Sequence, residues 1–144
     1  MKLLLKSGLL GAILLSAPSM AQSSCSPKGL DVCKMARQIA DEMAGMLPLR
    51  LNQNLSIQTV FAERHSVTLT AKFEYDKTTL DRVLADAGMS NDQMLDVMRK
   101  NAKGAVCATN APAKPFIENG GLIRYLYRFN DGSKYTTVLV ASCA

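Results

Sequence analysis

The sequence predicts a small exported α+β domain, in which an N-terminal helix and two further helices cover one face of a four-stranded antiparallel sheet built from two β-hairpins. Three observations lead to this prediction. Segments with helical periodicity and segments with alternating apolar and polar residues follow one another in the order α-β-β-α-α-β-β. The chain has four cysteines, an even number typical of two disulfides in an exported protein. An apolar stretch of the kind that directs export precedes all four.

The N-terminus has the three parts of a secretory signal peptide. Lys2 and Lys6 give a positive start, "LLLKSGLLGAILL" is the apolar middle, and "SAPSMA" ends in the small residues that signal peptidase reads. The pattern predicts a signal peptide over residues 1–21, cleaved after Ala21, and a single exported α+β domain over residues 22–144. No second apolar stretch follows that could stop transfer through the membrane.

Cys25 lies close enough to the cleavage site to raise the question of lipid attachment. A lipidated cysteine needs an apolar residue three positions before it, and Gln22 stands there instead. Lipidation would also leave an odd number of cysteines for pairing. We therefore expect a protein that is exported without a lipid anchor.

The four cysteines allow three pairings. We prefer Cys25–Cys33, which closes a short loop onto the start of a helix, and Cys107–Cys143, which ties the last strand to the segment that leaves the helices. No two cysteines have the C-x-x-C spacing of zinc or redox sites, so we expect no metal site.

The first helix is expected in "PKGLDVCKMARQIADEMAGML", with Asp31 near its start and Pro48 after its end. The first hairpin follows, with its turn at "ERHS". Its core face is predicted from simple alternation. The predicted apolar stripe of the helix is Leu30, Cys33, Ala40, Met43 and Leu47, and the predicted core face of the hairpin is Leu55, Ile57, Thr59, Phe61, Val67, Leu69, Ala71, Phe73 and Tyr75.

Two short helices are expected next. Thr78 and Asp81 resemble a capping box at the start of the first, and Gly88 follows its end. Ser90 and Gln93 match the capping box more fully in the second helix. The segment "CATNAPAKPFIENGG" is predicted to be irregular because two prolines and two glycines interrupt it.

The second hairpin is the strongest local pattern, because Asp131-Gly132 is a favoured two-residue turn between alternating strands. It places Asn130 opposite Ser133 and Tyr125 opposite Val138. The face expected in the core is Ile123, Tyr125, Tyr127, Phe129, Val138 and Val140. The other face combines apolar and cationic residues, and it either binds a partner or lies under other parts of the domain. This candidate partner-binding face is Leu122, Arg124, Leu126, Arg128, Tyr135 and Leu139.

No enzymatic constellation is recognisable. The single histidine, His65, has no nucleophile or acid beside it in a known motif, and Gly-rich phosphate loops are absent. Without the signal peptide the net charge falls from +5 to +3, and no Lys/Arg run indicates nucleic-acid binding. We therefore predict a non-enzymatic binding module without a cofactor. A small hydrolase that depends on His65 is a less favoured hypothesis.

The segments "LPLRLNQNLSIQTV", "GGLIRYLYRFNDG" and "VASC", with Cys107 and Cys143, give the region from Leu47 to Cys143 a layout similar to that of the α/β pilotins of the type II secretion system. The resemblance implies a small periplasmic protein that binds the C-terminal segment of a secretin or another envelope secretion-complex subunit. Such binding would use a groove or the addition of a strand. The alternative function is a periplasmic inhibitor or immunity protein that blocks a hydrolase or a toxin.

Overall fold

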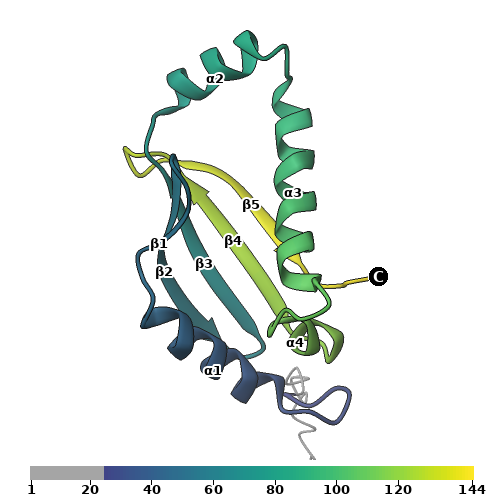
Figure 1. Ribbon diagram of the computed structural model, residues 1–144. Helices are drawn as coiled ribbons and strands as arrows, with labels where there is room; N and C mark the ends of the chain where they lie inside the picture. Colours follow the sequence, from purple (N-terminus) through teal and green to yellow (C-terminus); the bar gives the residue numbers. More distant parts are fainter. Residues whose placement is uncertain (1–24) are drawn as a thin grey trace, which may run out of the picture.

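The computed structural model describes residues 25–144, so the signal peptide predicted over residues 1–21 lies outside the described residues. The described chain forms one five-stranded sheet accompanied by four helices (Figure 1). In chain order the elements are α1 (Val32–Ala44), β1 (Leu49–Asn52), β2 (Leu55–Glu63), β3 (Ser66–Phe73), α2 (Lys77–Asp86), α3 (Asn91–Cys107), α4 (Lys114–Glu118), β4 (Leu122–Arg128) and β5 (Lys134–Val140).

The sheet is mixed, with strand order β1-β2-β3-β4-β5, because β3 and β4 are parallel while the other neighbouring strands are antiparallel. The prediction of four purely antiparallel strands is therefore wrong on both counts. A parallel pair needs a long crossover connection. Here α3 carries the chain back along the sheet (Figure 1), so β4 starts beside the start of β3 and Leu122 pairs with Ser66. The unpredicted strand β1 is short and pairs only with β2.

The predicted α+β architecture with helices on one face is confirmed. In Figure 1, α3 runs along the β5 side of the sheet, α1 crosses its lower end and α2 lies beyond its upper end. All four helices contribute to a single core with one face of the sheet. Its largest fully buried side chains are Phe116, Ile57, Leu80, Val32 and Val67.

A β-bulge in β2 changes the core face of the first hairpin. Ile57 pairs with Ala71, but the next pair is Thr59 with Thr70, so one extra residue lies in β2. An extra residue turns the rest of the strand over, because side chains alternate between the faces. Val60 and Ala62 therefore pack against the core in place of the predicted Thr59 and Phe61, and Phe61 is 50% exposed.

The helix α1 begins at Val32, directly after Asp31, which was predicted to lie near its start. Asp31 is its N-cap, and the carboxylate accepts a hydrogen bond from the Lys34 N–H at 3.0 Å. The buried side of the helix differs from the predicted stripe at its N-terminal end, because Leu30 precedes the helix and is exposed. The buried helical residues are Val32, Cys33, Ala36 and Ala40.

The caps of α2 and α3 show one wrong prediction and one confirmed prediction. The N-cap of α2 is Asp76 rather than Thr78, and the hydrogen bond from the Thr79 N–H lowers the pKa of the Asp76 carboxyl. The capping box of α3 is complete, because Ser90 Oγ accepts from the Gln93 N–H and Gln93 Oε1 accepts from the Ser90 N–H.

The segment predicted to be irregular contains the short helix α4. Proline at its start favours a first helical turn, and the two apolar residues that follow, Phe116 and Ile117, are buried in the core. Gly121 allows the chain to pass directly over the Phe116 ring, since a Cβ at this position would lie 2.4 Å from ring atoms. Gly121 thus permits a close approach of the backbone to the ring rather than only a flexible connection.

The second hairpin has the predicted register over most of its length, and Tyr125 pairs with Val138. At the turn, however, the Phe129 N–H donates to the Ser133 carbonyl, so Asn130 does not face Ser133. Arg128 then pairs with Lys134 while Tyr127 pairs with Thr136, which leaves Tyr135 as an extra residue in β5. Tyr135 consequently turns toward the core, where its ring centroid lies 5.3 Å from that of Phe129.

Both preferred disulfides, Cys25–Cys33 and Cys107–Cys143, are present. Two such bridges indicate folding in an oxidising compartment. Within residues 25–144, none of the helices has the length and apolar character needed to cross a bilayer.

Candidate binding surfaces

A groove of about 700 Å³ opens on the helix-bearing face of the sheet, between α1 with β1 on one side and α3 on the other. Met43 and Leu49 belong to the first wall, and Met94 and Val97 to the α3 wall. The floor consists of core-face strand residues, namely Ile57, Leu69, Phe73, Tyr125 and Tyr127. The groove exists because α1 and α3 cover opposite parts of the sheet and leave the part between them open.

The chemistry of the groove is apolar and uncharged. No Asp, Glu, Lys or Arg of the described chain lines it, and methionines from both walls contribute flexible, polarisable side chains. Polar contacts come from Asn101, from tyrosine hydroxyls in the floor, and from the amide side chains at the end of β1 and in the β1–β2 turn, namely Asn52, Gln53 and Asn54. The described residues offer no hydrogen-bond partner to the hydroxyls of Tyr125 and Tyr127, so these hydroxyls can bond to an occupant.

The floor is a cluster of aromatic rings. The centroid of Phe73 lies 5.1 Å from that of Tyr75 and 6.0 Å from that of Tyr127. Tyr125 lies 6.2 Å from Tyr127, within the range in which aromatic pairs attract. Burial raises the pKa of Tyr127 to about 12, and it also raises the pKa of Tyr75, Tyr125 and Tyr135.

Alkaline titration tests this aromatic floor. Because the folded pKa values lie above the unfolded value near 10, the phenols add stability that is complete below pH 10 and is lost as the pH rises toward 12. At pH 10 we expect the tyrosinate absorbance of the native protein to be well below that of the urea-unfolded protein, in which about half of the tyrosines are ionised. Equal ionisation of the two states at pH 10 would contradict the burial of these side chains.

The second candidate surface is the opposite side of the sheet. Of the predicted partner-binding residues, Leu122, Arg124, Leu126, Arg128 and Leu139 lie on this side, and none of them packs against the core. Tyr135 does not belong to the surface, because the bulge in β5 places its ring against Phe73 and Phe129. We call this surface the open face, and it comprises Ser56, Thr59, Phe61, Glu63, Ser66, Thr68, Thr70, Lys72, Leu122, Arg124, Leu126, Arg128, Lys134, Thr137 and Leu139.

The helices of the described residues join the core on the other side of the sheet from the open face. At the centre of the open face, Thr68 is nevertheless only 3% exposed. Leu139 is 57% exposed.

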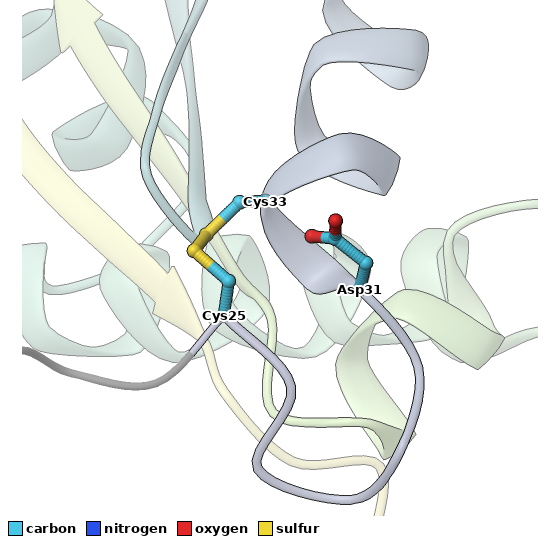
Figure 2. A group of neighbouring side chains, drawn as sticks. All are labelled: Cys25, Asp31 and Cys33. Carbon is cyan, nitrogen blue, oxygen red and sulfur yellow. A yellow bond between two sulfur atoms is a disulfide. The ribbon is translucent and has the colours of Figure 1, made fainter.

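Cys25, Asp31 and Cys33 form a third cluster, at the start of α1 (Figure 2). A metal would need cysteine thiolates, but the two sulfurs are joined in a disulfide. The Asp31 carboxylate is engaged as the helix cap, and the Val32 N–H donates to the Cys25 carbonyl at 2.7 Å. This cluster fixes the chain at the entrance of α1. His65, the residue on which the hydrolase hypothesis depends, lies in the β2–β3 turn, where its carbonyl accepts from the Leu122 N–H.

The groove is a site that the sequence pattern did not predict. Met43 belongs to the apolar stripe predicted for the first helix, whereas Met94 and Met98 lie on α3, where Met98 is buried. The methionines themselves were the available signal, because a methionine-rich stripe can also serve as a binding surface. Their convergence on one groove depends on how α1 and α3 are placed over the sheet.

Comparisons with known proteins agree with this architecture. No family model matches the sequence, and no curated protein sequence matches it. Among solved structures, a Pseudomonas aeruginosa protein described as secreted has a TM-score of 0.58 at 14% identity, covering 76% of this chain and 88% of that one.

Two pilotins are similarly close in structure. The pilotin EpsS of the Vibrio vulnificus type 2 secretion system has a TM-score of 0.58 at 17% identity and covers 78% of this chain and 92% of its own. The type II secretion system pilotin AspS of Vibrio cholerae has a TM-score of 0.55 at 20% identity, with 76% and 87% covered. The chain therefore has the α+β fold of the type II secretion pilotins.

Proposed function

We propose that this protein is a non-enzymatic, pilotin-like accessory protein of the periplasm, exported by its signal peptide and free of a lipid anchor. It binds a segment of a secretin or of another envelope secretion-complex subunit. The fold shared with two pilotins supports the class of function. The observation that carries the proposal is the uncharged, methionine-lined groove across the helix-bearing face.

The shape of the groove favours a helix as its occupant. Its floor is the face of a sheet, where the backbone groups are already paired within the ladder, so an incoming strand finds no hydrogen bonds there. An amphipathic helix can instead insert its apolar side between the wall formed by α1 with β1 and the α3 wall. The groove volume lies within the range of well-formed protein binding sites.

The absence of a lipid anchor in this proposal follows from the chemistry of Cys25. Its sulfur forms the disulfide with Cys33, and the same sulfur cannot also carry a lipid. A pilotin-like protein of this kind would act on its partner from solution, or would reach the membrane through the partner itself.

Filling the groove tests the proposal. Ala105 lines the α3 wall and is exposed, so Ala105→Trp can place an indole in the groove without disturbing the core. We expect the affinity for a peptide from the C-terminal segment of the cognate secretin to fall about tenfold or more, as measured by isothermal titration calorimetry. Val97→Asp, which adds a charge to the uncharged lining, should have the same effect.

The matched control is Arg99→Trp, which adds the same indole to an exposed α3 position outside the groove lining. It should bind the peptide like the wild type, since its exposed salt bridge with Asp96 contributes little to stability. Undiminished binding by both groove variants, or no binding by the wild-type protein, would refute the proposal. Inhibition of a periplasmic hydrolase in place of peptide binding would favour the inhibitor function.

A further inference from the structure

The open face is a second surface, separated from the groove by the thickness of the sheet. Its residues form rows across the strands, because Thr68, Arg124 and Leu139 are neighbours in the register, as are Thr70, Leu126 and Thr137. Along β4 the side chains therefore alternate between cationic and apolar in one straight line. Successive members of this line lie about 6.6 Å apart, so the guanidinium-bearing residues Arg124 and Arg128 are separated by about 13 Å.

The cations on this face have no anionic partner in the described chain. The three salt bridges among residues 25–144 lie within α2, α3 and α4, and none involves Lys72, Arg124 or Arg128. The arginines are nevertheless oriented by neutral groups. Arg124 Nη1 donates to Thr68 Oγ1 at 3.4 Å, and Arg128 Nη1 donates to the Gly132 carbonyl at 2.8 Å. Each guanidinium keeps further N–H donors for an incoming carboxylate.

We propose that the open face docks an acidic amphipathic helix of a partner protein. Charge complementarity favours a partner helix with acidic side chains opposite Arg124 and Arg128. Leu126 and Leu139 favour apolar side chains of the partner between these acidic ones. Residues four apart on a helix rise by about 6 Å, close to the 6.6 Å spacing of the β4 side chains. A helix running along β4 would therefore present an acidic, an apolar and an acidic residue at i, i+4 and i+8.

Strand length sets the size of this segment. The seven residues of β4 extend over about 23 Å, which a helix of about 15 residues spans. A second copy of this chain is a poor occupant, because two open faces would bring Lys72, Arg124 and Arg128 against themselves. A bilayer is also disfavoured, since the side chains of Arg124 and Arg128 are half-buried within a rigid sheet instead of projecting from it.

The test uses the full mature protein and a capped helical peptide of about 16 residues that repeats Glu, Leu and Glu at i, i+4 and i+8. Binding is measured by fluorescence anisotropy, and the contact surface by backbone amide shifts. We expect the amides of β4 and β5 to shift and the affinity to fall with added salt. In Arg124→Gln/Arg128→Gln the affinity should fall on the order of tenfold. Leu139→Glu, at an exposed position, should weaken binding similarly without affecting the fold.

The matched control is Arg37→Gln/Arg82→Gln, which removes the same charge from exposed positions on α1 and α2 and should bind the peptide unchanged. The groove variant Ala105→Trp should also bind this peptide unchanged, which separates this proposal from the proposed function. An equal loss of peptide affinity in Arg124→Gln/Arg128→Gln and in Arg37→Gln/Arg82→Gln would overturn the proposal. Such a result would show that only the net charge of the protein matters. Amide shifts confined to the groove, or binding of phosphatidylglycerol vesicles but not of the peptide, would overturn it as well.

Discussion

Replacing both Cys107 and Cys143 by alanine is expected to lower the free energy of unfolding by about 4 kcal/mol. The bridge joins residues 36 apart in sequence and ties the end of α3 to the chain after β5. Without it, the unfolded chain gains the freedom of a long open loop, while the folded chain loses the link between the end of α3 and the segment that follows the edge strand β5. Urea unfolding at fixed pH, followed by circular dichroism, measures the loss.

The second disulfide supplies the control, because it closes a much shorter loop. Cys25 and Cys33 are separated by only 8 residues, so Cys25→Ala/Cys33→Ala should lower the free energy of unfolding by about 2.5 kcal/mol. A larger loss from the short bridge than from the long one would contradict this account. The intact mass of the wild-type protein should equal that of residues 22–144 less four hydrogens, whereas an added lipid would refute the proposed lipid-free state.

Phe116→Ala is expected to lower the free energy of unfolding by about 3–5 kcal/mol. The ring is completely buried, at 0% exposure, and it is among the largest fully buried side chains of the core. Its removal leaves a cavity at the junction of α4 with the start of β4, where the surrounding backbone can relax only in part. Chemical unfolding measures the effect, and Glu118→Ala, at an exposed position of α4, should change the stability by less than about 0.5 kcal/mol.

A double-mutant cycle shows whether the contact with Gly121 is the physical reason for the tight packing. Gly121→Ala would place its Cβ 2.4 Å from the ring and should cost about 1–3 kcal/mol by overpacking. In Phe116→Ala the space for that methyl group is already free. The two losses should therefore not add, and the double variant should be little less stable than Phe116→Ala alone. Full additivity would show that the ring and the glycine do not constrain each other.

The outcome for Tyr135 illustrates the limit of strand alternation. Simple alternation placed it with Leu139 on one face, and it would have been correct for an unbroken ladder. The extra residue in β5 reverses the direction of Tyr135 but leaves the pairing of Tyr125 with Val138 unchanged. The same effect in β2 exchanges Phe61 for Val60 and Ala62. A bulge depends on how two strands fit together, so one strand's sequence does not reveal it.

The short helix α4 illustrates a different limit. The segment "CATNAPAKPFIENGG" contains two prolines and two glycines but only two large apolar residues. Rules that use only neighbouring residues therefore predict an irregular segment and no buried helix. Phe116 and Ile117 are nevertheless buried, because the crossover from α3 to β4 brings the segment under the sheet end. The burial of Phe116 and Ile117 therefore depends on how the chain passes from α3 to β4, which the sequence of this segment alone does not specify.

The sequence by itself determined the features that depend on near neighbours or on simple counting. The alternating strands, the Ser90 capping box and the Asp31 cap are local, and the even number of cysteines indicated the two disulfides that are present. Only the tertiary structure decided the parallel contact of β3 with β4 and the groove between α1 and α3. Periodicity specifies which side of an element avoids water, but not which other element covers it. That choice depends on packing between segments far apart in the chain, and both candidate binding surfaces arise from it.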